Sequence, residues 1–146
     1  MTTEVPQVDR EEIILRRIYI GPGYFNPAST PPVERGAFLP NSWDVDGISL
    51  YIERLTSAGD LVRNARLPMS QYVVARMKAN DFYNLGLSLV PDQRPDDLPG
   101  HVIVREFTHD NYKNRPEWKL RIKEAAALLA KIASGDLLKF EEVTPT

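Results

Sequence analysis

The segment from Asp44 to Phe107 constrains the fold most, because it carries most of the strand-like periodicity of the chain. Apolar and polar residues alternate over 48–53, which is the period of a half-buried β-strand. Three further short apolar runs are separated by turn residues and have the length of strands: 72–75, 87–90 and 101–107. The segment therefore predicts a small, mainly antiparallel sheet.

Two segments outside this region have features of amphipathic helices. In Asp9–Tyr19 the first residue can cap a helix, because Glu12 follows three residues later as in a capping box. Pro116 suits the first turn of a longer helix that ends at Ser134. The predicted buried stripe of that longer helix is Trp118, Ile122, Ala125, Leu129 and Ile132. Residues 137–140 are expected to add an edge strand.

Residues 21–40 contain five prolines and little periodicity, which predicts a long irregular loop. Loops of this length in small domains are usually functional or mobile. Three aromatic side chains of the loop, Tyr24, Phe25 and Phe38, are expected to anchor it to the body of the protein. The same three residues are our candidates for contacts with a partner.

Together these patterns predict an α+β fold: a small, mainly antiparallel sheet packed against a long C-terminal helix, with an N-terminal helix and the Pro-rich loop. The 146 residues fit a single domain over 1–146, with polar tails at 1–8 and 141–146. The net charge of −2 gives no general attraction to nucleic acid or anionic membranes. With no cysteine, disulfides and thiolate metal sites are excluded. We expect a cytoplasmic protein without a secretory signal or membrane segment.

Asp44 and Asp46 stand in an acidic turn before the first predicted strand. Their spacing partly fits a calcium-binding loop, but Ser42 occupies the first ligand position and the predicted flanks are not helical. The simpler interpretation is a turn whose carboxylates bond to local N–H groups. His101 begins the last predicted strand, beside an acidic loop, and an aspartate there could orient it as a general base. Because only His109 could join it as a second imidazole, we predict no metal site.

A basic cluster marks the start of the long helix. Arg115, Lys119 and Lys123 share one helix face, and positive charge near a helix N-terminus opposes the helix dipole. A bound anion would relieve that conflict. The alternative is a solvated face in which helix-spaced glutamates partner the basic residues.

The chain contains no nucleophile elbow, phosphate-binding loop or zinc-protease motif. We therefore expect a non-enzymatic binding or accessory subunit of a larger, bacterial-type assembly, with another protein as its partner and no cofactor. The first alternative is a small enzyme acting on a nucleotide or phosphorylated substrate: His101 is the general base, Asp44 or Asp46 orients it or binds a metal, and Arg115 or Lys119 neutralises the phosphate. The second is a regulatory module that binds nucleic acid through the basic helix face. The small side chains of the long helix are also compatible with a homo-oligomer.

Overall fold

The computed structural model describes residues 8–140. Most of the two predicted polar tails, residues 1–7 and 141–146, lies outside the described residues. Val8, which the sequence placed in the N-terminal tail, is a buried part of the core. In the described range, no helix is long and apolar enough to cross a membrane.

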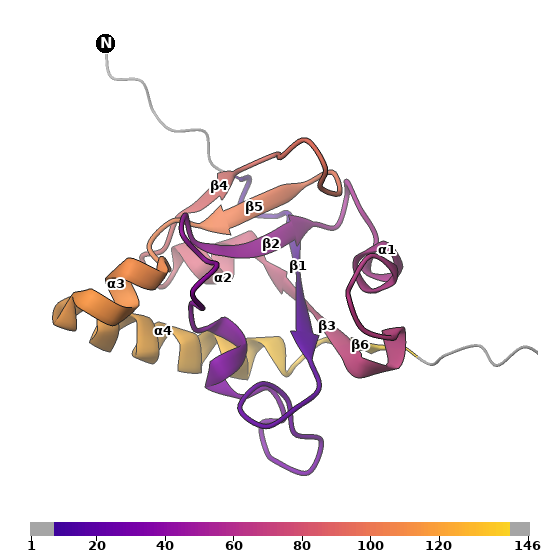
Figure 1. Ribbon diagram of the computed structural model, residues 1–146, viewed down its shortest axis with the longest axis horizontal. Helices are drawn as coiled ribbons and strands as arrows, with labels where there is room; N and C mark the ends of the chain where they lie inside the picture. Colours follow the sequence, from indigo (N-terminus) through magenta and orange to yellow (C-terminus); the bar gives the residue numbers. More distant parts are fainter. Residues whose placement is uncertain (1–7, 141–146) are drawn as a thin grey trace, which may run out of the picture.

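The described chain forms one six-stranded sheet with helices on both faces (Figure 1), which confirms the α+β class. The strand order is β4-β5-β2-β1-β3-β6, and every neighbouring pair is antiparallel. The strands are β1 (Ile13–Tyr19), β2 (Ile48–Ile52), β3 (Tyr72–Lys78), β4 (Leu89–Pro91), β5 (His101–Val104) and β6 (Leu137–Lys139). The predicted edge strand near the C-terminus is therefore present as β6.

The predicted N-terminal helix over Asp9–Tyr19 is wrong, because residues 13–19 form the strand β1. The capping-box residues make a turn instead: the Asp9 carbonyl accepts the Glu12 N–H at 3.1 Å, and the Asp9 carboxylate accepts the Glu11 N–H at 2.9 Å. Strand β1 pairs with β3 along its whole length and buries side chains on both sides of the sheet, among them Ile14 and Leu15. Pairing with distant strands thus outweighs the local helix signal.

Strands β1 and β2 share only two residue pairs, Ile14 with Ile52 and Leu15 with Tyr51. Beyond them the two strands diverge, so that β1 points down in Figure 1 while β2 runs across the view. By contrast, β1 and β3 are paired over seven positions. The sheet therefore consists of two three-stranded halves that are joined at one end and open at the other.

The helices complete the two layers around the sheet. They are α1 (Ala58–Arg63), α2 (Ala79–Tyr83), α3 (His109–Asn114) and α4 (Pro116–Ala133), with short 3₁₀ turns η1 (Arg35–Phe38) and η2 (Met69–Gln71). The predicted long C-terminal helix is therefore present as α4. A large core joins α4 to one face of the sheet, and a smaller cluster joins α1 to the other.

The buried stripe of α4 is rotated relative to the prediction. Its buried residues are Ile122, Ala126, Leu129, Ala130 and Ala133. Ile132, which the sequence placed in the stripe, is 38% exposed. The helix packs closely against η1 and α3 as well as against the sheet, so its apolar side faces all three.

The segment 21–40 is less irregular than its proline content suggests. It contains the isolated bridge between Phe25 and Val33 and ends in η1. Phe25 and Phe38 are buried, and the Val33 N–H donates to the Ser134 hydroxyl at 3.1 Å. These contacts hold the segment against the C-terminal end of α4, and other residues of the segment form one wall of the site described below.

The neighbouring leucines of α4 provide a matched test of this packing. Leu129 is fully buried, so we expect Leu129→Ala to lower the free energy of unfolding by about 2–5 kcal/mol through the cavity that it leaves. Leu128 is 49% exposed, and Leu128→Ala should change that free energy by no more than about 0.5 kcal/mol. Urea unfolding of both variants measures the difference. Equal effects, or a larger effect of Leu128→Ala, would contradict this orientation of α4.

Candidate functional site

A cavity of about 620 Å³ lies where β1 and β2 diverge. Residues of β1 and β2 line it, together with the loop that leads from η1 to β2 and the segment that follows α1. Three of its lining residues are arginines, Arg16, Arg17 and Arg66. Five are aromatic: Tyr19, Tyr24, Trp43, Tyr51 and Tyr72. The cavity thus combines positive charge with flat apolar walls.

The Arg16 side chain bridges the gap between the two halves of the sheet. Its Nη1 donates to the main-chain carbonyl of Ser49 at 2.7 Å, and its Nε and Nη2 donate to that of Ala37 at 3.1 and 2.8 Å. Its guanidinium carbon lies 5.9 Å from the centre of the Phe38 ring. Burial lowers the pKa of Arg16, and the negative charge of Asp44 opposes that shift. Arginine stays charged at neutral pH even so, so Arg16 brings a fixed positive charge into the cavity wall.

Arg17 and Arg66 add two further cationic side chains to the same cavity. Arg17 donates to the carbonyl of Leu61 at 2.8 Å, and its guanidinium carbon lies 5.6 Å from the centre of the Tyr72 ring. In residues 8–140, no carboxylate lies within ion-pair distance of Arg16, Arg17 or Arg66. The positive charge of the cavity is therefore only partly balanced, by Asp44 at longer range.

The structure separates the two aspartates of the acidic turn. Asp44 is buried and lines the cavity, and its carboxylate accepts the N–H of Asn41 at 2.8 Å. Burial raises the pKa of Asp44, while that hydrogen bond and the charge of Arg16 oppose the rise. Asp46 is exposed instead, with an oxygen 3.5 Å from a guanidinium nitrogen of Arg94. Within residues 8–140, no group of three or more acidic or histidine side chains is arranged to hold a metal ion.

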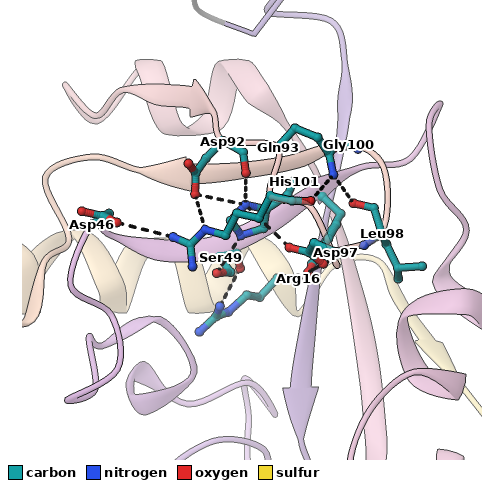
Figure 2. Close-up of polar contacts among 11 residues, drawn as sticks. Arg16, Asp46, Ser49, Asp92, Gln93, Asp97, Leu98, Gly100 and His101 are labelled. Carbon is teal, nitrogen blue, oxygen red and sulfur yellow. Dashed lines mark hydrogen bonds and ion pairs between the residues drawn. The ribbon is translucent and has the colours of Figure 1, made fainter.

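His101 is buried on β5, with 3% of its surface exposed, and both ring nitrogens have partners (Figure 2). Nδ1 lies 2.6 Å from the main-chain carbonyl of Asp92, and Nε2 lies 2.9 Å from the Ser49 hydroxyl. Because a carbonyl oxygen can only accept, the proton of the neutral ring is on Nδ1. Nε2 then carries the lone pair, and the Ser49 hydroxyl donates to it.

Carboxylates surround the Nδ1 side of His101. An Asp92 oxygen lies 3.4 Å from Nδ1 and an Asp97 oxygen lies 3.9 Å from it. The Tyr51 hydroxyl donates to Asp97 at 2.7 Å, and its pKa is raised, first by burial and then by this carboxylate. Arg94 donates to Asp92 at 2.7 Å and so holds that side chain beside the ring. The carboxylates near the His101 ring are therefore those of Asp92 and Asp97. Asp44 and Asp46, which the sequence analysis gave as orienting residues for a catalytic His101, make no contact with it.

Two glycines allow β2 and β5 to bring Ser49 and His101 together. Gly47 has φ +136°, and a Cβ there would lie 2.2 Å from the carbonyl oxygen of Val104 on β5. Gly100 has φ +87° and directly precedes His101. Both backbone conformations favour glycine. Next to these turns, β2 and β5 pair so that His101 is opposite Tyr51, which puts it on the same side of the sheet as Ser49.

Sequence reasoning missed Ser49, Asp92 and Arg16. The alternation over 48–53 did put Ser49 on the polar face of a strand, but its partner is 52 residues away. The signal that could have found this pair is the register of β2 against β5, which the sequence does not reveal. Arg16 was assigned to a predicted helix, where no reason existed to place it beside β2.

The predicted anion-binding residues lie apart from the cavity. Arg115 pairs with Asp110 at 3.3 Å, and Lys119 lies over the ring of Tyr112, 5.8 Å from its centre. Lys123 follows one turn later and is half-buried. Arg115 is the N-cap residue of α4, and Lys119 and Lys123 lie in its N-terminal half. Whether these three basic residues bind an anion stays a prediction.

The chain matches no family model, and no curated protein or solved structure is significantly similar to it. No relative therefore contributes a function or a site residue. The candidate function rests on the geometry of the cavity and of the network around His101.

The raised pKa of Asp44 gives a pH-dependent test of its burial. A carboxyl whose pKa is raised by folding stabilises the protein below its unfolded pKa of about 3.9, and this contribution is lost as the pH rises through the folded-state pKa. The stability advantage of the wild type over Asp44→Asn should therefore shrink as the pH rises above about 4.

Urea unfolding of both proteins across this range measures the difference, in which the other carboxylates cancel. Asp46→Asn is the matched control, because Asp46 is two residues away and exposed. If the stability advantage of the wild type instead grew with pH, the effects of Arg16 and the Asn41 N–H on the pKa of Asp44 would be larger than the effect of burial.

Proposed function

We propose that this protein binds a small anionic molecule carrying a planar ring, such as a nucleotide, in the cavity between β1 and β2. The observation that carries the proposal is the presence of three arginines and five aromatic residues in one cavity. The proposal keeps the nucleotide or phosphorylated ligand of the sequence-based enzyme alternative. It replaces the basic residues of the long helix by the three arginines of the cavity as the groups that bind the anion.

The charge of the cavity supports an anionic ligand. Arg17 makes one hydrogen bond to a main-chain carbonyl, so most of its N–H donors are left for other partners. Arg66 is exposed at the cavity wall. Guanidinium groups match the geometry of phosphate and carboxylate oxygens, and hydrogen bonds between charged groups contribute about 1.5–3 kcal/mol each.

The aromatic residues support a planar group on the ligand. Trp43 lines the cavity with 74% of its surface exposed, which leaves its indole ring free to stack. Tyr19 and Tyr72 form an edge-to-face pair with ring centres 6.3 Å apart, so they make one continuous wall. Stacking of a base on an aromatic side chain contributes about 1–3 kcal/mol.

The accessory-subunit and nucleic-acid hypotheses stay predictions. Of the three proposed partner contacts, Phe25 and Phe38 are buried in the core, and Tyr24 is half-buried beside the cavity. No contact on the basic side of α4 within the described residues indicates whether this side binds a nucleic acid or only faces solvent. The cavity favours the small-molecule alternative, because it combines charge and aromatic surface in one place.

Binding of AMP, adenosine and inorganic phosphate tests the proposal. We expect AMP to quench the fluorescence of Trp43 and to bind more tightly than either of its parts, because only AMP uses both the charge and the aromatic wall. The chain has two tryptophans, so Trp118→Phe provides the background in which the signal of Trp43 is read alone. Equal binding of adenosine and AMP would contradict the role of the arginines.

Arginine variants locate the anion. Arg17→Gln and Arg66→Gln should each weaken AMP binding roughly 10- to 100-fold, which is the loss of one charge-assisted hydrogen bond. The matched control is Arg105→Gln, which removes an exposed arginine outside the lining of the cavity. An unchanged affinity in both cavity variants, or an equal loss in the control, would exclude this cavity as the binding site.

A further inference from the structure

The hydroxyl of Ser49 stands between the cavity and the buried imidazole of His101. Ser49 is half-buried and lines the cavity, while its Oγ lies 2.9 Å from Nε2 of His101 (Figure 2). His101 itself is not among the residues that line the cavity. A ligand in the cavity therefore meets Ser49 first, with the histidine behind it.

The ring of His101 is held in the tautomer that a general base needs. Its Nδ1–H is bound to the carbonyl of Asp92, which leaves the lone pair of Nε2 directed at the Ser49 hydroxyl. The carboxylates of Asp92 and Asp97, 3.4 and 3.9 Å from Nδ1, stabilise the positive charge that the ring acquires when it takes a proton. Nucleophile, base and orienting groups thus stand in the order required for covalent catalysis.

A positive charge lies next to the same serine. The guanidinium of Arg16 donates to the main-chain carbonyl of Ser49 at 2.7 Å. Hydrogen bonds to main-chain oxygens use three of its five N–H groups. The remaining two can stabilise negative charge that develops on a ligand atom bound beside Ser49.

We infer that Ser49 is a nucleophile with His101 as its general base, and that the protein hydrolyses carboxylic esters of anionic molecules bound in this cavity. The inference rests on the proposed anion-binding function. In the first step Ser49 Oγ bonds to the ester carbonyl carbon as its proton moves to Nε2 of His101. The bond to the alcohol oxygen then breaks, and His101 returns the proton to that oxygen. His101 then takes a proton from water as the water oxygen bonds to the acyl carbon. The bond from that carbon to Ser49 Oγ breaks, His101 returns the proton to Oγ, and the carboxylic acid leaves and ionises.

Labelling with a fluorophosphonate tests the nucleophile without knowledge of the substrate. Attack by Ser49 forms an Oγ–P bond and expels fluoride, so intact-mass spectrometry should show a single adduct that peptide mapping places on Ser49. Ser49→Ala should abolish the adduct. The matched control is Ser42→Ala, which removes an exposed serine close in sequence and should label like the wild type.

The role of His101 requires a variant that keeps the fold. The side-chain amide of His101→Gln can still donate to the Asp92 carbonyl but cannot act as a base, and labelling should slow by about 100-fold or more. Circular dichroism and thermal unfolding check that the variant is folded, and His101→Asn replaces it where it is not. Labelling of Ser49 at the wild-type rate in a folded variant would overturn the inference.

Two matched esters test the substrate class. Hydrolysis of 4-nitrophenyl hydrogen succinate should exceed that of 4-nitrophenyl butyrate by about 10-fold or more in kcat/KM, because only the succinate ester carries a carboxylate for the arginines. Arg17→Gln with Arg66→Gln should remove this preference while fluorophosphonate labelling persists. Equal rates on both esters in the wild type would overturn the anionic substrate class.

Failure of the inference and failure of the proposed function give different results. A folded wild type that binds AMP but forms no adduct at Ser49 overturns the catalytic inference and leaves the binding site in place. A protein that forms the adduct but neither binds AMP nor prefers the anionic ester overturns the anionic-ligand proposal and, with it, the substrate class inferred here.

Discussion

The early end of the ladder between β1 and β2 is the constraint on which the rest of the structure depends. Two residue pairs join the halves of the sheet, and beyond them the guanidinium of Arg16 satisfies the carbonyl of Ser49 in place of a strand partner. The same guanidinium holds the carbonyl of Ala37 in η1, so one side chain connects β1, β2 and the Pro-rich segment. Without it, these partly buried oxygens would lose their donors, at a cost of up to about 1–3 kcal/mol each.

The hydrogen bonds of Arg16 therefore contribute both to the stability of the fold and to the wall of the cavity. A closed sheet would have filled the space between the strands with hydrogen-bonded backbone, whereas the open one leaves a cavity whose wall carries fixed positive charge. Asp44 balances part of that charge. Because its carboxyl is buried, its pKa is raised even though the charge of Arg16 opposes the rise. The molecule thus keeps a partly uncompensated charge inside its fold, an arrangement that favours an anion from outside.

The parts of the fold that the sequence predicts are those that local patterns specify. The period and end signals of α4 are contained in its own residues, as is the alternation of β2. Strand β1 was missed because its conformation depends on pairing with β3, some sixty residues away. The capping-box residues that precede it form a turn and not the start of a helix. The site was missed in part for the same reason: Ser49 meets His101 only through the register of β2 and β5.

The anchoring of His101 on a main-chain carbonyl has an evolutionary consequence. Every residue type offers a carbonyl, so the path of the chain, and not the identity of residue 92, sets the tautomer and direction of the ring. The aspartate side chain is therefore not needed to orient the imidazole, and its carboxylate is left to face the charge that the ring acquires, while the glycine at 100 shapes the path of the chain. In any wider set of homologous chains, the histidine and its preceding glycine should be inherited together.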